Sequence, residues 1–312
     1  MSVLITGGAG FIGSHLADRL VSSKKVSVVD NLSSGKLENL DNNIDQLDFT
    51  KLDLTVKFEV ASLMNGFETV FHVAANPEVN ASKASPDQQF RQNIEVTYNI
   101  LEAMRRSDTS EIVFTSTSTV YGENVEIPTP EDYGPLKPIS LYGATKLADE
   151  ALISAYANMY GLKATIYRLA NVIGPRSNHG VIYDFIHKLK KSPEKLMVLG
   201  DGSQSKSYIY ISDCIEGILQ GRNHNKTVEI FNIGTNSQTN VLEIAEIVKT
   251  EMNYPRAEIT TTGGVDGGRG WKGDVKTMQL DTRKLTQTGW KPEYTSTEAV
   301  TKTVQEILTY LN

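Results

Sequence analysis

The chain opens on Val3-Leu4-Ile5-Thr6-Gly7-Gly8-Ala9-Gly10-Phe11-Ile12-Gly13, the stretch that decides its fold. The apolar residues 3–5 predict a short strand, and the pattern after Gly13 predicts a helix. Gly7, Gly10 and Gly13 stand where a tight turn brings backbone N–H groups and a helix N-terminus against a pyrophosphate. The next predicted strand ends at Asp30, whose carboxylate can accept from both ribose hydroxyls and repels a 2′-phosphate. This unit predicts a dinucleotide site that takes NAD.

Strands and helices continue to alternate along the first part of the chain. The predicted strands are 26–29, 47–52, 69–73, 112–114, 164–168 and 229–233, and the predicted helices are 56–64, 92–106 and 142–160. This alternation implies an α/β fold with a doubly wound parallel sheet, the Rossmann architecture. Beyond about Ala170 the pattern loosens, and we expect a smaller C-terminal lobe over the strand ends, where open α/β sheets bind ligands. We assign residues 1–170 and 208–233 to the dinucleotide-binding domain, and residues 171–207 and 234–312 to the substrate-binding lobe.

The composition is that of a globular protein of 312 residues, with 39% hydrophobic and 22% charged residues. The net charge of −6 carries no basic block, which argues against nucleic acid or an anionic membrane as a partner. Cys214 is the only cysteine, which excludes an internal disulfide, and the five histidines lack metal-binding spacing. No apolar run reaches the ~18 residues of a membrane span, and no signal-peptide pattern precedes the first strand. We therefore expect a cytoplasmic protein that binds no metal.

A second signature lies in the middle of the chain. The strand at 112–114 leads into a hydroxyl-rich turn with Thr117, and a helix capped by Ser140 carries Tyr142 and Lys146 one turn apart. An ammonium at about 4 Å, at an effective dielectric near 20, supplies roughly the 4 kcal/mol that lowers a phenol pKa from about 10 to about 7. We expect Tyr142 to act as a base, with Thr117 sharing the proton. The pair alone decides little, because in a chain with 13 tyrosines this spacing arises by chance about once.

Together, these motifs resemble the extended short-chain dehydrogenase/reductase family, specifically its nucleotide-sugar epimerase branch, over essentially the whole chain. The resemblance implies a catalytic set of Thr117, Tyr142 and Lys146. It implies a cofactor-binding set of Gly7, Gly10, Phe11, Ile12, Gly13, Asp30, Asn31, Asp53, Leu54, Ala74, Ala75, Asn93, Thr115, Tyr142 and Lys146. It implies a substrate-binding set of Thr117, Asn171, Val181, Met197, Leu199, Lys206, Asp274 and Met278.

Two positions depart from the pattern of that branch. Lys206 stands where the family has an arginine, and Ser207 stands where it has an aspartate. Lysine keeps the positive charge but lacks the two-pronged geometry of the guanidinium. We therefore expect contact with the substrate diphosphate, with a geometry that the resemblance does not define.

The residues after Thr117 narrow the expected reaction. Sugar-nucleotide 4,6-dehydratases carry an Asp-Glu pair there, because eliminating water across C5–C6 needs its own acid and base, and related decarboxylases carry a glutamate at the second position. Ser118 and Thr119 occupy these positions here and have no carboxyl group. The resemblance therefore implies reversible oxidation at C4, as in a UDP-hexose 4-epimerase that interconverts UDP-glucose and UDP-galactose with NAD.

The choice of sugar stays open between UDP-glucose, UDP-N-acetylglucosamine and both. In this family a bulky tyrosine four residues after the Asp274 position excludes the N-acetyl group, and here that place is Met278, which could also merely pack in the lobe. A non-catalytic NAD-sensing regulator is a further alternative, although such proteins often lose the Tyr/Lys pair that this chain keeps. The helices at 92–106 and 142–160 resemble the family's dimer-forming pair, so we expect a homodimer.

Overall fold

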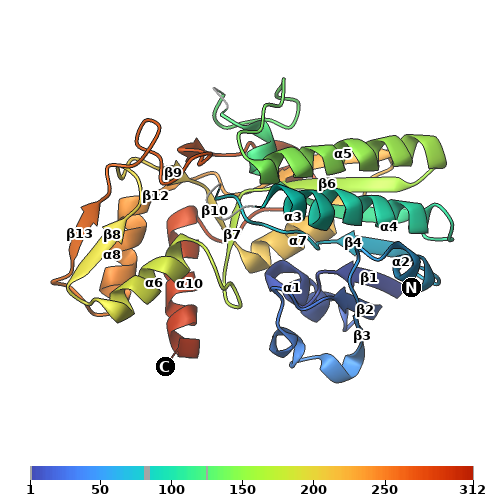
Figure 1. The fold of residues 1–312 in the computed structure, drawn as a ribbon, viewed down its shortest axis with the longest axis horizontal. Helices are drawn as coiled ribbons and strands as arrows, with labels where there is room; N and C mark the ends of the chain where they lie inside the picture. Colours follow the sequence, from blue (N-terminus) through green and yellow to red (C-terminus); the bar gives the residue numbers. More distant parts are fainter. Residues whose placement is uncertain (1, 81–84, 124–125, 312) are drawn as a thin grey trace.

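A parallel sheet of seven strands forms the centre of the large lobe (Figure 1). The structure is a computed structural model that describes residues 2–80, 85–123 and 126–311. In sheet order the strands are β11 (Val228–Ile233), β6 (Lys163–Leu169), β5 (Glu111–Thr117), β4 (Thr69–His72), β1 (Ser2–Thr6), β2 (Lys25–Asp30) and β3 (Leu47–Lys51). All six neighbouring pairs run parallel. The order reverses after β1, which places the start of the chain at the centre of the sheet.

Helices cover both faces of this sheet. One face carries α1 (Phe11–Leu20) and α7 (Ile211–Gly221), and the other carries α2 (Lys57–Leu63), α4 (Val96–Met104) and α5 (Leu141–Tyr160). Successive strand residues point to opposite faces, so Val3 and Ile5 pack with the first pair of helices and Leu4 packs with the second set. The doubly wound α/β architecture expected from the sequence is confirmed.

The helix expected at 92–106 begins earlier and is not uniform. A short helix α3 (Pro86–Gln89) runs into a π-helical turn, η3 (Phe90–Glu95), before α4 begins. Ser85 caps it, with its hydroxyl accepting from the backbone N–H of Gln88 at 3.5 Å. Three further short helical turns occur: η1 (Leu37–Leu40), η2 (Ile44–Gln46) and η4 (Ser118–Tyr121). π-Helical turns are rare in proteins overall, and those that occur often lie near functional sites.

The smaller lobe has its own apolar core, formed between three helices and a strand pair. Its elements are α6 (Val181–Lys191), β8 (Lys195–Val198), α8 (Val241–Glu251), β13 (Glu258–Thr261) and α10 (Ser296–Leu311). Phe185, Leu196, Val248 and Val304 are among the side chains buried there. Short strands line the side that faces the large lobe: β7 (Asn171–Ile173) with β10 (Tyr208–Tyr210), and β9 (Ser205–Lys206) between β12 (Thr239–Asn240) and β14 (Thr277–Met278). A short helix, α9 (Arg283–Thr286), follows them.

The segment from β10 to β11 leaves the small lobe and returns to the large one. Its helix α7 packs beside α1, and β11 forms the edge of the large sheet next to β6. We therefore propose the domain division given above, with residues 208–233 in the dinucleotide-binding domain. Because the chain crosses between the lobes several times, both lobes contribute walls to the space between them.

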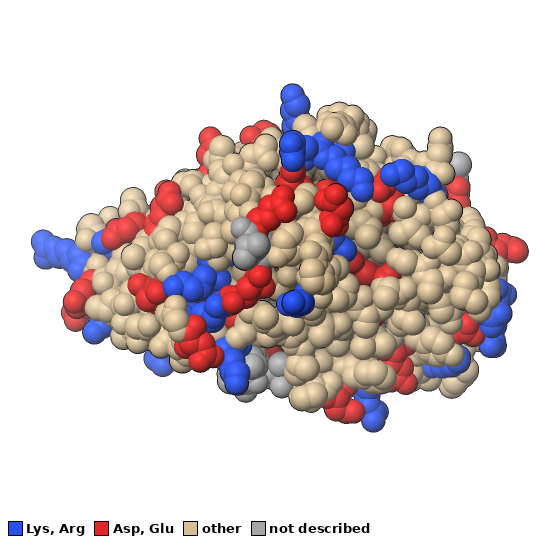
Figure 2. Space-filling model, turned by 90° about the horizontal axis from the view of Figure 1, so that it is seen from above, with Lys and Arg blue, Asp and Glu red and all other residues tan. Residues whose placement is uncertain are grey.

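Charged side chains are mixed in sign on the face shown in Figure 2, which agrees with the dispersed charge of the sequence. Within the described ranges, no helix combines the length and the apolar character that crossing a membrane requires. Across the same ranges, the structure groups no three His, Cys, Asp or Glu side chains in a way that could hold a metal ion.

Candidate active site

A cavity of about 910 Å³ lies between the two lobes, at the carboxyl ends of the parallel strands. Most of the residues expected at the cofactor line it: Gly7, Gly10, Phe11, Ile12, Gly13, Asp30, Asn31, Asp53, Leu54, Ala74, Ala75, Thr115 and Tyr142. Most of those expected at the substrate line it as well: Thr117, Asn171, Val181, Leu199, Lys206, Asp274 and Met278. Asn93, Lys146 and Met197 are not part of this lining.

The phosphate loop is shaped to receive a diphosphate. Gly7 has a φ of +66°, and a Cβ there would lie 2.7 Å from Cα of Ala74, so only glycine fits. Gly10 is the N-cap of α1 and provides no side-chain cap. The first N–H groups of α1, at Phe11 and Ile12, therefore have no partner within the helix and border the cavity. This cradle fits the pyrophosphate of a dinucleotide.

Asp30 is held in place by the backbone around it. Its carboxylate accepts from the N–H groups of Ala9 at 3.1 Å and Leu32 at 2.8 Å. Burial raises the pKa of Asp30, while these two hydrogen bonds oppose the rise. A carboxylate has about four acceptor sites, so two remain for ribose hydroxyls. Asp53 is similarly fixed, because its Oδ1 accepts from the backbone N–H of Thr55 at 3.0 Å.

Thr117 and Tyr142 meet the cavity from β5 and α5. Thr117 ends β5, and its hydroxyl accepts from the backbone N–H of Thr119 at 3.1 Å. The helix that carries Tyr142 is capped by Ser140, whose hydroxyl accepts from the backbone N–H of Gly143 at 3.1 Å. The capping residue expected from the sequence is therefore confirmed, and it fixes where Tyr142 enters the site.

The electrostatic environment of Tyr142 differs from the expectation. Burial raises the pKa of the Tyr142 phenol, and the nearby charge of Asp149 raises it further. Lys146 is buried with 1% of its surface exposed, and its Nζ lies 3.8 Å from the centroid of the Phe114 ring. The ammonium of Lys146 is directed at the Phe114 ring in this arrangement, and the expected lowering of the Tyr142 pKa by Lys146 stays a prediction.

Asn93 lies behind the cavity wall, in the π-helical turn. Its amide nitrogen donates to Thr145 at 2.9 Å and Gln89 at 2.8 Å, and its amide oxygen accepts from the backbone N–H of Asn76 at 2.7 Å. These bonds use the capacity of the amide. We therefore interpret Asn93 as the residue that ties the loop after β4 to α5, instead of the cofactor contact expected from the sequence.

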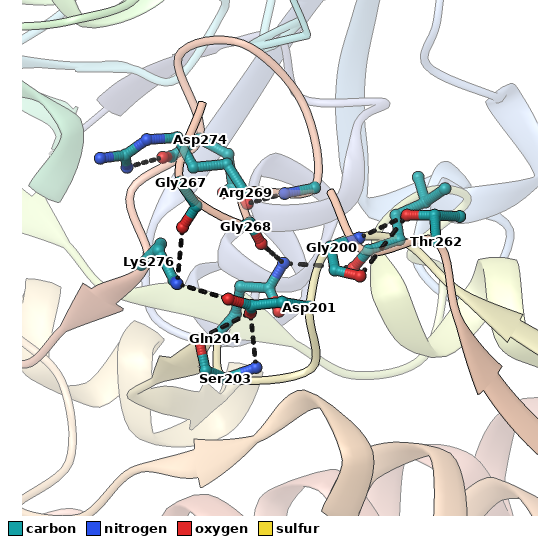
Figure 3. A network of polar contacts seen from close by, with 12 residues as sticks. Gly200, Asp201, Ser203, Gln204, Thr262, Gly267, Gly268, Arg269, Asp274 and Lys276 are labelled. Atoms are coloured by element: carbon teal, nitrogen blue, oxygen red, sulfur yellow. Dashed lines mark hydrogen bonds and ion pairs between the residues drawn. The ribbon is translucent and has the colours of Figure 1, made fainter. Parts of the chain in front are cut away.

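A loop of the small lobe carries a network of polar contacts (Figure 3), and its residues Trp271, Gly273 and Asp274 line the cavity. Lys276 donates to Asp201 at 2.8 Å and to the carbonyl of Gly267 at 2.9 Å. Arg269 donates to the carbonyl of Asp274 at 2.6 Å and forms an ion pair with Glu123 of the large lobe. The loop is therefore anchored to both lobes around the mouth of the cavity.

Lys206 and Asp274 face each other in this part of the cavity. Lys206 Nζ lies 2.6 Å from Asp274 Oδ1 and 5.6 Å from the Trp271 ring centroid. Met278 is 5% exposed and pairs with Lys206 in the strand ladder between β14 and β9. Lys206, Asp274 and Met278, which the sequence assigned to the substrate, therefore lie together. The two residues of the ion pair are 68 positions apart in the chain.

Met197 does not lie with Leu199 in the cavity. The strand β8 alternates between exposed and buried residues, and Met197 is on the exposed side, where its sulfur accepts from the Thr260 hydroxyl at 3.6 Å. Met197 shares this exposed side with Lys195, because side chains alternate along the strand, and the strand ends before Leu199. The expectation that Met197 contacts the substrate base is therefore not supported by its position.

Three unassigned residues line the cavity and carry buried polar atoms that have no hydrogen-bond partner among the described residues. These atoms are Nη1 of Arg176, Oε1 of Gln204 and Nε1 of Trp271. Buried polar groups are rarely left unpaired, so this wall is suited to a polar ligand. Gln204 lies two residues before Lys206, in the stretch that resembles the family pattern, whereas the sequence assigned no role to Arg176 or Trp271.

Comparison with known proteins identifies the family. The model of the NAD dependent epimerase/dehydratase family matches residues 3–234. The chain is similar to the UDP-glucose 4-epimerase of Mycolicibacterium smegmatis, with 32% identity over 98% of each chain. It is similar in structure to a UDP-galactose 4-epimerase, with a TM-score of 0.90, 41% identity and full coverage of both chains. It is also similar to the UDP-N-acetylglucosamine 4-epimerase of Methanobrevibacter ruminantium, with a TM-score of 0.88, 29% identity and coverage of 99% and 98%.

The match spans most of the chain and includes the phosphate loop, Asp30 and the helix that carries Tyr142 and Lys146. The protein is therefore a member of the NAD-dependent epimerase/dehydratase family.

Proposed function

We propose that the protein is a UDP-hexose 4-epimerase that interconverts UDP-glucose and UDP-galactose. The observation that carries this proposal is one cavity lined by the phosphate loop, by the Lys206–Asp274 pair, and by Thr117 and Tyr142. Ser118 and Thr119 also line it and supply no carboxyl group for dehydration. The similarity to UDP-sugar 4-epimerases supports the same class of substrate.

In the proposed reaction, the chain's own residues bind the two nucleotides and move one proton. NAD, when bound at the phosphate loop and Asp30, supplies the hydride acceptor for oxidation at C4 and the donor for reduction. Tyr142 acts in its phenolate form: it takes the proton of the 4-hydroxyl as C4 is oxidised, becomes the neutral phenol, and returns the proton after the 4-keto sugar has presented its other face. Thr117 presents a second hydroxyl beside that proton. Lys206 holds the substrate diphosphate, in exchange for part of its contact with Asp274.

The direct experiment is to incubate the protein separately with UDP-glucose and UDP-N-acetylglucosamine and to resolve the products. We expect UDP-galactose from the first, and a measurable amount of the C4 epimer from the second. Failure of both sugars to epimerise, in protein that retains NAD, would contradict the proposal.

The second candidate, an epimerase that also accepts the N-acetyl sugar, is favoured by Met278. This side chain is unbranched and can move aside for a group several atoms larger than a hydroxyl. Met278→Tyr should lower kcat/KM for UDP-N-acetylglucosamine by an extra factor of about 10–200 relative to UDP-glucose, the usual range of an apolar size filter. The matched control is Met197→Tyr, which lies outside the cavity and should leave the ratio of the two sugars unchanged. Equal loss on both sugars would rule out Met278 as the gate.

We also propose that the protein is a homodimer that pairs through α4 and α5. Large apolar side chains are exposed on these helices, including Tyr98 at 38%, Met159 at 72% and Tyr160 at 47%. Several large apolar side chains exposed on two neighbouring helices are a feature expected of an association site. Light scattering should give twice the monomer mass, and Met159→Glu combined with Tyr98→Glu should give the monomer mass. A monomeric wild-type protein at micromolar concentration would contradict the pairing.

A further inference from the structure

Asp149, on α5, is a buried acid without a visible partner. Its residue is 1% exposed, and neither Oδ1 nor Oδ2 accepts a hydrogen bond from any residue that the structure describes. An unpaired carboxylate in the interior is costly, and such groups persist where a nearby charge or a functional role compensates. The mechanism above does not use Asp149.

The nearest candidate for that compensation is Lys146. Asp149 follows Lys146 by three positions on α5, which places them about one turn apart, about 4.5 Å along the axis. Lys146 is equally buried, and no carboxylate of the described residues lies within ion-pair distance of its Nζ. Glu150, the other acid nearby, is committed elsewhere, because it binds Arg168 at 2.7 Å and Ser116 at 2.5 Å.

A chain of hydrogen bonds leads from Thr6, at the end of β1, to the hydroxyl of Thr97, which lies near Asp149. The hydroxyl oxygen of Thr6 accepts from the backbone N–H groups of Val73 and Ala74, both at 3.2 Å. With both of its lone pairs occupied, Thr6 must donate to Nδ1 of His72, at 2.8 Å. His72 therefore carries its proton on Nε2 and donates it to the hydroxyl of Thr97 at 3.0 Å.

The end of this chain fixes the orientation of Thr97. Its oxygen accepts from His72, so its own proton is free to point toward Asp149, where it lowers the pKa of the carboxyl group. Burial and the charge of Lys146 lower the pKa of His72 to about 3, so the imidazole stays neutral and contributes no charge. The hydrogen-bond chain therefore orients the site, while the charge beside Lys146 comes from Asp149.

We propose that Asp149 is a positioning residue for Lys146: its buried carboxylate is the counter-charge that keeps the Lys146 ammonium protonated, and the chain Thr6–His72–Thr97 orients a hydroxyl group toward that carboxylate. The consequence of this role of Asp149 for catalysis rests on the proposed function, in which Lys146 supports Tyr142. The negative charges near Lys146 favour its protonated form, as the proposal requires. Burial lowers the pKa of Lys146 to about 8, and Asp149, followed by Glu150, opposes that fall.

Asp149 also affects Tyr142, where its negative charge disfavours the charged form, the phenolate. Its charge raises the pKa of the phenol directly. Tyr142 is two turns away, about 10 Å along the axis, whereas Lys146 is one turn away. Because Coulomb energy falls with distance, the effect on Lys146 is the larger of the two. The polar groups around Asp149 come from four elements that pack together. They are Tyr142, Lys146 and Glu150 on α5, His72 on β4, Thr97 on α4, and Arg168 on β6, which is paired with Glu150.

The test measures the Lys146 pKa directly, by NMR titration of protein carrying lysine labelled at Cε, with the resonance assigned from Lys146→Arg. In the wild type we expect a main inflection near pH 8 and a smaller one near pH 6, from Asp149, whose pKa burial raises to about 6. Asp149→Asn keeps the shape and removes the charge, so the Lys146 pKa should fall by about 1–3 units. The upper pH limit of epimerase activity should fall with it.

A matched control is Glu246→Gln on α8. Glu246 and Lys249 have the same spacing and lie 2.9 Å apart, but Glu246 is exposed to solvent. Because this pair lies far from the active site in the small lobe, Glu246→Gln should leave the Lys146 titration and the pH profile of activity unchanged.

Two results would overturn the proposal: a Lys146 titration in the wild type that shows no second inflection from Asp149, or an unchanged Lys146 pKa in Asp149→Asn. The first result is measured on the wild-type protein, so it tests the proposal even if Asp149→Asn fails to fold. If the titration behaves as expected but UDP-hexoses are not epimerised, the proposed function fails and the role of Asp149 stands.

Discussion

Tyr142→Phe should lower the turnover of UDP-hexoses by about 10²–10⁴, the usual contribution of a positioned acid–base group. The substitution removes one hydroxyl group and keeps the ring, so the wall of the cavity and the packing of α5 remain. NAD content and thermal stability should therefore match the wild type. Steady-state kinetics with UDP-galactose, together with the NAD content of the purified variant, provide the measurement.

The control is Tyr160→Phe, which removes a phenol from the same helix at a position outside the cavity and should cost less than threefold in turnover. A loss smaller than tenfold in Tyr142→Phe would exclude Tyr142 as the group that moves the proton. A large loss accompanied by loss of NAD would show a structural effect and would also count against the assignment.

Glu150→Ala should destabilise the protein by about 3–5 kcal/mol, because it leaves the charge of Arg168 buried and unpaired. The two side chains are 5% and 4% exposed, and Arg168 donates to Glu150 through Nε and Nη2. Glu150 also accepts from Ser116, so the pair ties β5, β6 and α5 together directly beneath Tyr142 and Lys146. Urea unfolding followed by circular dichroism measures the free energy of unfolding.

The double variant Glu150→Leu/Arg168→Met separates the cost of an unpaired charge from the cost of lost packing. Replacing both partners of a buried ion pair by apolar residues of similar volume is often neutral, so the double variant should recover most of the loss. A single-variant loss below about 1 kcal/mol would show that solvent or another acid reaches Arg168.

The fold could be read from the sequence because its signals are local. Gly7, Gly10 and Gly13 report a turn that only glycine can form, and the alternation of apolar strands and helices determines the layers. The return of 208–233 to the large sheet was harder to infer. It depends on which edge strand β11 pairs with, a contact between residues far apart in the chain.

The site was read less completely, since side-chain direction depends on tertiary packing. Met197 and Leu199 are two residues apart, yet only Leu199 lines the cavity, because the chain turns after β8. Lys146 and Tyr142 share a helix face as expected, but Phe114 of β5 determines where the ammonium lies. Nothing in the local pattern around Asp149 distinguishes a buried acid from a solvated one. Trp271 reaches the cavity only because of the path of the loop that carries it.

The most direct test of the central claim, reversible oxidation at C4 of a UDP-hexose, follows a deuterium placed on C4 of UDP-galactose. The protein should convert this substrate to UDP-glucose that keeps the label on C4, because the hydride leaves and returns within one active site. Mass spectrometry and NMR of the product measure its retention. Loss of the label to solvent, or absence of UDP-glucose, would contradict the account.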